Sequence, residues 1–175
     1  LFFKIWLRNL FSINVKSLFF NCSIKGFRDK YSVIIIKGKF SYKIFYNAKI
    51  NMQNSQLTFN QIFSKPDSRR TTFKMMSDSQ LNVTGDFDIF SGGHIIINKG
   101  AKLILGSGYI NYDVKIRCFD EITIGHNVAI SENVTIWDTD AHQIIGKESE
   151  MTKPVKIGNR VWIGNNVTIL KGVTI

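Results

Sequence analysis

The side chains of this 175-residue sequence that can do acid–base chemistry near neutral pH are three histidines and a group of carboxylates. His142 lies in the segment DTDAH, where a regular pattern of the sequence is interrupted. A neutral imidazole can take the proton of a hydroxyl group as that hydroxyl attacks, which makes His142 a candidate general base. Asp138 and Asp140, in the same segment, can accept hydrogen bonds from substrate hydroxyls or hold the turn of a loop.

Cysteine chemistry is a weaker candidate. Cys22 and Cys118 lie far apart, which indicates neither a disulfide framework nor a zinc cluster, and neither lies in a motif of a nucleophile. A reducing compartment is therefore expected. No apolar run approaches the roughly 18 residues that a transmembrane helix needs.

The element that must position His142 is defined by a six-residue repeat. It is carried by aliphatic residues at Ile97 and Leu103; at Ile104, Ile110, Ile116 and Ile122; at Ile124, Ile130 and Ile136; and at Ile157, Ile163, Ile169 and Ile175. Neither a helix of period 3.6 nor an alternating strand produces this spacing. A β-solenoid does, because each unit is one short strand followed by a corner, stacked on the unit one coil away. Residues that tolerate left-handed backbone stand at the expected corners, at Asn127, Asn133, Asn159, Asn165, Asn166 and Gly172.

The rest of the chain divides around this repeat. Residues 96–175 form the predicted β-helix core, with a loop projecting at about 137–154. Residues 31–95 are rich in β-formers and turn signals, and they are expected to form an irregular β region of atypical coils. The sequence ends at Ile175 within a repeat, so further coils beyond it are expected.

Residues 1–30 are predicted to form a basic amphipathic helix and a linker. Residues 1–70 carry a net charge of +11 and the remainder −1, so any attraction to an anionic surface belongs to the N-terminal part. Within residues 1–20, Lys4, Arg8 and Lys16 share one helical face. Such a helix either docks on the protein or a sister subunit, or makes peripheral contact with a membrane.

The units ITIGHNVAISENVTI (122–136) and VKIGNRVWIGNNVTILKGVTI (155–175) resemble the hexapeptide-repeat acyltransferases. The linking segment 137–158 resembles the galactoside, maltose and polysaccharide sugar O-acetyltransferase branch in particular. The resemblance implies an all-β, left-handed parallel β-helix. It also implies a homotrimer that transfers acetyl from acetyl-CoA to a sugar hydroxyl, without a metal, in surface-polysaccharide biosynthesis. The expected location is the cytoplasm, and the basic N-terminal helix would fit work at the inner face of the membrane.

The same resemblance assigns roles to individual residues. It implies that His142 is the general base in a direct transfer and that Glu150 orients it. Asp113 falls near a position where relatives carry an acceptor-contacting asparagine, so Asp113, Asp138 and Asp140 are the candidate substrate contacts. Trp162, Lys153 and Arg160 are the candidate contacts to acetyl-CoA.

Other readings remain open. A carbonic anhydrase of the γ type would need His94, His126 and His142 on one zinc ion. A serine or nucleotide-sugar acetyltransferase, or a scaffold without activity, would use the same fold. Charge alone is compatible with nucleic acid, but no recognition motif supports that partner, and none is expected.

Overall fold

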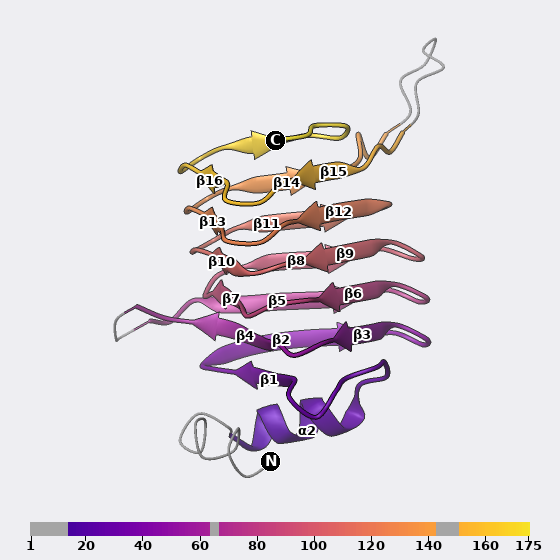
Figure 1. The fold of residues 1–175 in the computed structure, drawn as a ribbon, viewed down its shortest axis with the longest axis vertical. Helices are drawn as coiled ribbons and strands as arrows, with labels where there is room; N and C mark the ends of the chain where they lie inside the picture. The colour runs from indigo at the N-terminus through magenta and orange to yellow at the C-terminus, as the bar shows by residue number, and fades with distance from the viewer. Residues whose placement is uncertain (1–13, 64–66, 143–150) are drawn as a thin grey trace.

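The computed structural model describes residues 14–63, 67–142 and 151–175. In these ranges one helix, α2 (Val15–Ser23), is followed by a stack of short strands that rises from the N-terminal to the C-terminal end (Figure 1). Glu150 and residues 1–13 of the predicted N-terminal helix lie outside the described residues. Within these ranges, no helix is both long enough and apolar enough to span a membrane.

The strands form three parallel sheets, which are the three faces of a prism. The first face contains β1 (Val33–Ile36), β4 (Gln56–Gln61), β7 (Phe87–Phe90), β10 (Gly108–Ile110), β13 (Val128–Ile130) and β16 (Trp162–Ile163). The second face contains β2 (Lys39–Ile44), β5 (Arg70–Met75), β8 (His94–Ile97), β11 (Lys115–Cys118), β14 (Thr135–Trp137) and β17 (Thr168–Ile169). The third face contains β3 (Lys49–Met52), β6 (Gln80–Val83), β9 (Lys102–Leu105), β12 (Glu121–Ile124) and β15 (Val155–Ile157).

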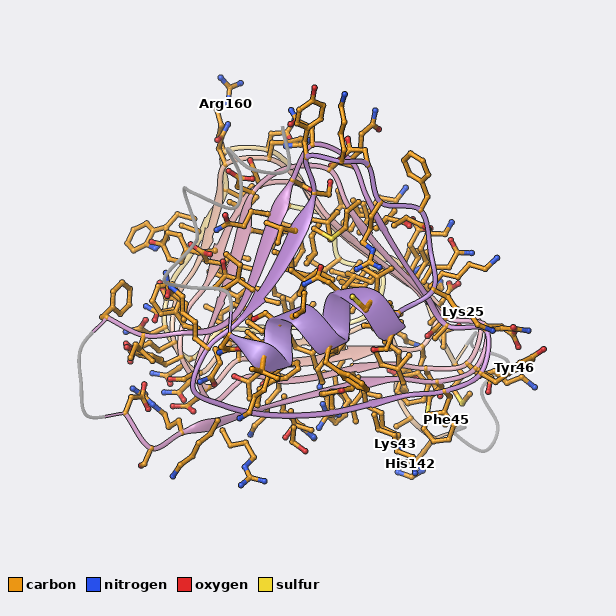
Figure 2. All side chains as sticks on the ribbon, turned by 90° about the horizontal axis from the view of Figure 1, so that it is seen from below. Lys25, Lys43, Phe45, Tyr46, His142 and Arg160 are labelled. Carbon is orange, nitrogen blue, oxygen red and sulfur yellow. The ribbon has the colours of Figure 1, made fainter. Side chains whose placement is uncertain are left out.

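The prism is wound as a left-handed helix. Figure 2 looks along the prism from the α2 end, so the chain recedes from the viewer as it advances. The second face ends at the corner of Phe45 and Tyr46, and the third face leads from there to the corner of Arg160. In this view the chain therefore runs counterclockwise while it moves away from the viewer, which is the sense of a left-handed helix. The prediction of a left-handed parallel β-helix is confirmed.

We name the corners by the faces they join. The first corner joins the first face to the second, the second corner joins the second face to the third, and the third corner returns to the first face. Positive φ angles at Asn127, Asn133 and Asn166 confirm that these residues turn the chain. Asn159 and Asn165 act differently: their side chains accept the backbone N–H of His126 and Glu132 in the coil below, at 2.7 and 3.1 Å.

The core is a set of aliphatic columns inside the prism. Alternate residues of each strand point inward, so the register places equivalent residues of successive coils on top of one another. One column runs through Ile50, Leu81, Leu103, Ile122 and Val155, all with 0–1% exposure. The six-residue period of the sequence is therefore the repeat of one face plus one corner.

The first coils are built from larger side chains, and α2 closes them. Phe20 is fully buried, and its ring meets Tyr42 edge-on at 4.8 Å and Phe59 at 6.4 Å. Asn14 caps the helix by accepting the N–H of Ser17 at 3.0 Å. The described part of the N-terminal helix thus docks on the end of the solenoid. The strands of residues 33–97 continue the same three sheets as the later repeats.

Candidate functional site

The candidate active site begins where the chain leaves the β-helix at the second corner. The loop starts after Trp137 at the end of β14 and returns at β15. Its two arms are joined at the base by an antiparallel bridge between Thr139 and Thr152. The N–H of Asp140 donates to the carbonyl of Met151 at 3.0 Å. The loop therefore leaves the solenoid through a neck with fixed geometry.

Asp138 fastens this neck to the coil below. Its side chain is fully buried, and its two carboxylate oxygens accept the backbone N–H groups of Phe119 and Asp120 at 2.7 and 2.8 Å. Its carbonyl accepts the N–H of Lys153 at 3.0 Å. Burial raises the pKa of Asp138 above its ordinary value, while the two backbone hydrogen bonds oppose that rise. Of the two roles considered for Asp138, this geometry favours holding the loop.

His142 is the next chemically active group along the arm, and it is exposed. Ala141 before it has a φ of 62° and donates its N–H to the Thr139 hydroxyl at 3.0 Å, which turns the chain outward. Asp140 is exposed and pairs with Lys171 at 2.5 Å. Figure 2 places the His142 side chain on the outer side of the prism, toward solvent. A base in this position can reach a substrate that lies outside the β-helix.

Asp113 lies at the first corner, across the whole second face from the loop. It has a φ of 59°, and its carboxylate pairs with Arg69 at 3.4 Å. Arg69 also pairs with Asp67 at 3.1 Å and covers the ring of Tyr112 at 3.6 Å. The structure therefore does not bring Asp113 and His142 of one chain together.

This Arg69 cluster was not predicted, because only the fold brings its members together. The pKa of Asp67 is lowered to about 2, first by the Arg69 hydrogen bond and also by the Ser91 hydroxyl. The Asp67 carboxylate consequently stabilises the folded state at neutral pH, and that contribution declines as the pH falls from about 4 toward 2.

We expect Arg69→Met to lower the free energy of unfolding by about 1–2 kcal/mol at pH 7, because it removes two partly exposed ion pairs and a cation–π contact. Urea denaturation at pH 7 and pH 2 measures this difference. It should shrink at pH 2, where Asp67 is becoming protonated. A difference of equal size at both pH values would contradict the role given to the ion pairs.

The three residues predicted to contact acetyl-CoA surround the last coil. Arg160 lies at the third corner with a φ of 59°, and Lys153 lies at the second corner, so β15 separates them. Trp162 is on the first face with 78% exposure, and its Nε1 donates to the Ser131 hydroxyl at 3.2 Å. Arg160 and Trp162 lie close together in the sequence, whereas Lys153 belongs with the His142 loop.

The other histidines and the cysteines lie elsewhere. His94 is on the second face and His126 at the third corner, so the three histidines of one chain occupy three separate places. In residues 14–63, 67–142 and 151–175 no group of three His, Cys, Asp or Glu side chains can hold a metal ion. Cys118 is buried, and burial raises the pKa of its thiol far above the ordinary range. That thiol is poorly suited to be a nucleophile.

A left-handed β-helix with a histidine-bearing loop at one corner defines the structural class of this protein. The chain is 39% identical over 85 residues to galactoside O-acetyltransferase of Escherichia coli (strain K12), a match that covers 46% of this chain and 42% of the relative. It is 40% identical over 76 residues to polysialic acid O-acetyltransferase of Neisseria meningitidis, covering 41% and 34% respectively. These matches confirm the resemblance to the hexapeptide-repeat sugar O-acetyltransferases.

The matches are partial, because the chain spans less than half the length of these relatives. No protein-family model matches the chain. The crystal structure of the polySia-specific acetyltransferase NeuO aligns with 83% of this chain and 72% of its own, at 22% identity and a TM-score of 0.45.

Proposed function

We propose that the protein transfers an acetyl group from acetyl-CoA to a hydroxyl of a sugar, with His142 as the general base. The observation that carries this proposal is the anchored neck at the second corner. The buried Asp138 and the Thr139–Thr152 bridge present an exposed imidazole at a fixed place on an otherwise regular solenoid. The names of the matched relatives support O-acetyl transfer as the reaction class.

The chemistry needs one proton acceptor and no covalent enzyme intermediate. As the sugar oxygen attacks the thioester carbonyl carbon, its proton passes to the neutral imidazole of His142. The carbon–sulfur bond then breaks, the thiolate leaves, and the imidazolium can return the proton to it. Glu150 would orient the imidazole through a hydrogen bond to its second nitrogen, which fixes the tautomer. Asp140 would accept a hydrogen bond from the sugar, once its pair with Lys171 opens.

The donor would lie beside the last coil. Arg160 and Lys153 would contact phosphate groups, and Trp162 would pack against the pantetheine arm. A homotrimer would complete the arrangement, because Asp113 lies a full face away from His142 within one chain. A neighbouring subunit could bring its own Asp113 to this loop. We propose work in the cytoplasm, at the inner face of the membrane, on surface polysaccharide or its precursor.

Thiol release from acetyl-CoA across a panel of neutral sugars, amino sugars and acidic glycans tests the proposed reaction. We expect thiol release only when an acceptor is present, accompanied by the formation of an acetyl ester on that acceptor. Equal release with and without acceptors would contradict the transfer. A folded protein that does not bind acetyl-CoA at all would also contradict it and would favour a scaffold without activity.

A further inference from the structure

The second face differs from the other two in its charge. Its six strands contain only cationic charged side chains, Lys39, Lys43, Arg70, Lys74, Lys115 and Arg117, and no Asp or Glu. The strands of the first face contain one charged residue, Asp88. The third face mixes Lys49, Lys102 and Lys156 with Glu121. Among the strand residues, the second face therefore carries six cations, the third face three and the first face none.

These cations are stacked on one another and are not balanced by acids. The register sets Lys39 opposite Arg70, and Lys43 opposite Lys74. Like charges directly opposite each other on neighbouring strands destabilise a sheet. Among the described residues, no carboxylate forms an ion pair with any of the six. One of these pairs is stabilised by cation–π contacts with Phe45. The centroid of its ring lies 4.8 Å from the Lys43 Nζ and 5.6 Å from the Lys74 Nζ.

Carboxylates near this surface lie at its two borders. Asp67 and Asp113, at the first corner, are engaged with Arg69. Glu132 also lies at the first corner, and Asp78, Asp120, Asp138 and Asp140 lie at the second corner, all outside the strands. Among the described residues, the strands between these borders carry no negative charge, so a bound anion would relieve the repulsion between their cations.

The cationic row leads to the base of the His142 loop. In register, Lys43 is followed along the prism by Lys74, Ile96, Arg117 and Trp137. The row spans four strand spacings, or about 19 Å. Figure 2 shows Lys43, Phe45 and His142 on the same side of the prism in the view along its axis. A chain lying on this row would reach His142 at its far end.

The end of the row carries an aromatic side chain. Trp137 is half-buried, and because its Nε1 is covered, only the rest of the indole ring is open to a ligand. Below it, the Arg117 guanidinium is held by the His94 carbonyl at 3.0 Å, which fixes its direction. An indole ring beside a fixed guanidinium can contact a sugar ring and its carboxylate together.

The neighbouring row supplies hydrogen-bonding groups in place of apolar ones. It contains, in register, Ser41, Thr72, His94, Lys115 and Thr135. Of the strongly exposed large hydrophobic side chains, Tyr42 is the one that lies on a strand of this face. A helix that binds a membrane surface presents apolar groups to the lipid. An acidic carbohydrate is instead bound through hydrogen-bonding groups and cations. The composition of this face therefore favours a hydrophilic polyanion over a lipid surface.

We propose that the second face binds an extended, carboxylate-bearing glycan, and that this glycan is the acceptor whose hydroxyl reaches His142. Glycan binding by the second face does not depend on the proposed acetyl transfer. The identification of this glycan as the acceptor rests on that proposed function. It narrows the acceptor to a class, an acidic polysaccharide several sugars long. It also assigns Lys43, Lys74 and Arg117 to the binding of that polymer at a distance from the reacting atoms.

Binding of fluorescently labelled polysialic acid, with labelled dextran as the neutral probe, tests the surface without requiring activity. The variant Lys43→Gln/Lys74→Gln removes two cations of the row. We expect it to raise the Kd for polysialic acid about tenfold, as two partly exposed charge contacts would. The matched control Lys49→Gln/Lys102→Gln removes two cations of the third face and should change the Kd less than twofold. Equal effects of the two variants, or equal binding of dextran, would overturn the proposal.

Folding and selectivity are checked in parallel. The melting temperature of Lys43→Gln/Lys74→Gln should be unchanged or higher, because a like-charge pair is removed. Duplex DNA and anionic phosphatidylserine vesicles serve as competitors at the same ionic strength. Unlabelled polysialic acid should displace the labelled polymer at a lower concentration than either competitor does. If DNA or the vesicles displace it at a lower concentration, the proposal that this face binds a glycan would be overturned.

Kinetics separate this inference from the proposed reaction. With a long acidic acceptor, Lys43→Gln/Lys74→Gln should raise KM and leave kcat unchanged, whereas a single-sugar acceptor should show no change. Polymer binding that depends on Lys43 and Lys74 without any acetyl transfer would keep the surface and refute the reaction. Transfer to acidic and neutral polymers with equal KM would keep the reaction and refute the surface.

Discussion

Replacing His142 with alanine is expected to lower the rate of acceptor-dependent thiol release by about 100-fold or more. A positioned general base typically contributes between about 100-fold and 10,000-fold to such a transfer. The side chain is exposed beyond the neck, and no described residue depends on it for a hydrogen bond, so the fold should tolerate the change. Binding of acetyl-CoA should be unchanged, because His142 is expected to act on the acceptor hydroxyl.

The matched control is His126→Ala. His126 is also exposed, but it lies at the third corner, where its backbone forms the hydrogen bonds and its ring has no assigned role. Steady-state kinetics with both variants, together with melting temperatures, would separate a local chemical effect from a loss of structure. Full activity of His142→Ala would remove the general base from the mechanism. An equal loss in His126→Ala would point to a structural cause.

Asp138→Ala should have the largest effect on stability of any change in the loop. It removes the buried carboxylate that accepts the backbone N–H groups of Phe119 and Asp120, which are themselves only partly buried. Losing two partly buried hydrogen bonds to a carboxylate is expected to lower the free energy of unfolding by about 2–4 kcal/mol. Because the same carboxylate fixes the neck, kcat should fall as well. Urea denaturation and steady-state kinetics on one preparation measure both effects.

Two further variants show whether Asp138 acts by position or by contact with the sugar. Asp138→Asn retains one carbonyl oxygen as an acceptor, so it should restore part of the stability and part of kcat. Asp140→Ala, in the same loop, removes a surface ion pair with Lys171 and should cost less than about 1 kcal/mol. An Asp138→Ala protein of normal stability with a raised KM for the acceptor would instead make Asp138 a substrate contact.

The sequence made the solenoid predictable where its repeat is regular. From Ile97 onward one aliphatic residue recurs at each stacked position, because every coil must fill the same column of the core. In the first coils the columns are filled by larger side chains such as Phe59 and Phe73, and the coils are longer: the register pairs Lys39 with Arg70, 31 residues later, but Lys115 with Thr135, only 20 residues later. The sequence of these first coils therefore predicts short strands but not a solenoid with a regular repeat. The docking of α2 through Phe20 depends on these large side chains and could not be read from spacing.

The loop that carries the candidate site was predictable, but the way it is anchored was not. His142 is singled out because it lies where the repeat is interrupted, in a segment that resembles the sugar O-acetyltransferases. The anchoring role of Asp138 depends on the backbone of Phe119 and Asp120 one coil below, which lie 19 and 18 residues before it in the sequence. Asp113 and His142 lie at different corners because a strand of two to six residues separates successive corners. The cationic row alternates along strands and repeats across coils, so it becomes visible only once the register is known.

We propose that this β-helix acetylates a sugar hydroxyl through the loop at its second corner. Mass spectrometry of a glycan acceptor, after incubation with acetyl-CoA and either the unmodified protein or His142→Ala, measures this directly. We expect a base-labile O-acetyl ester on the glycan with the unmodified protein and almost none with the variant. Equal ester formation by both proteins, or acetyl-CoA cleavage that leaves every acceptor unmodified, would contradict it.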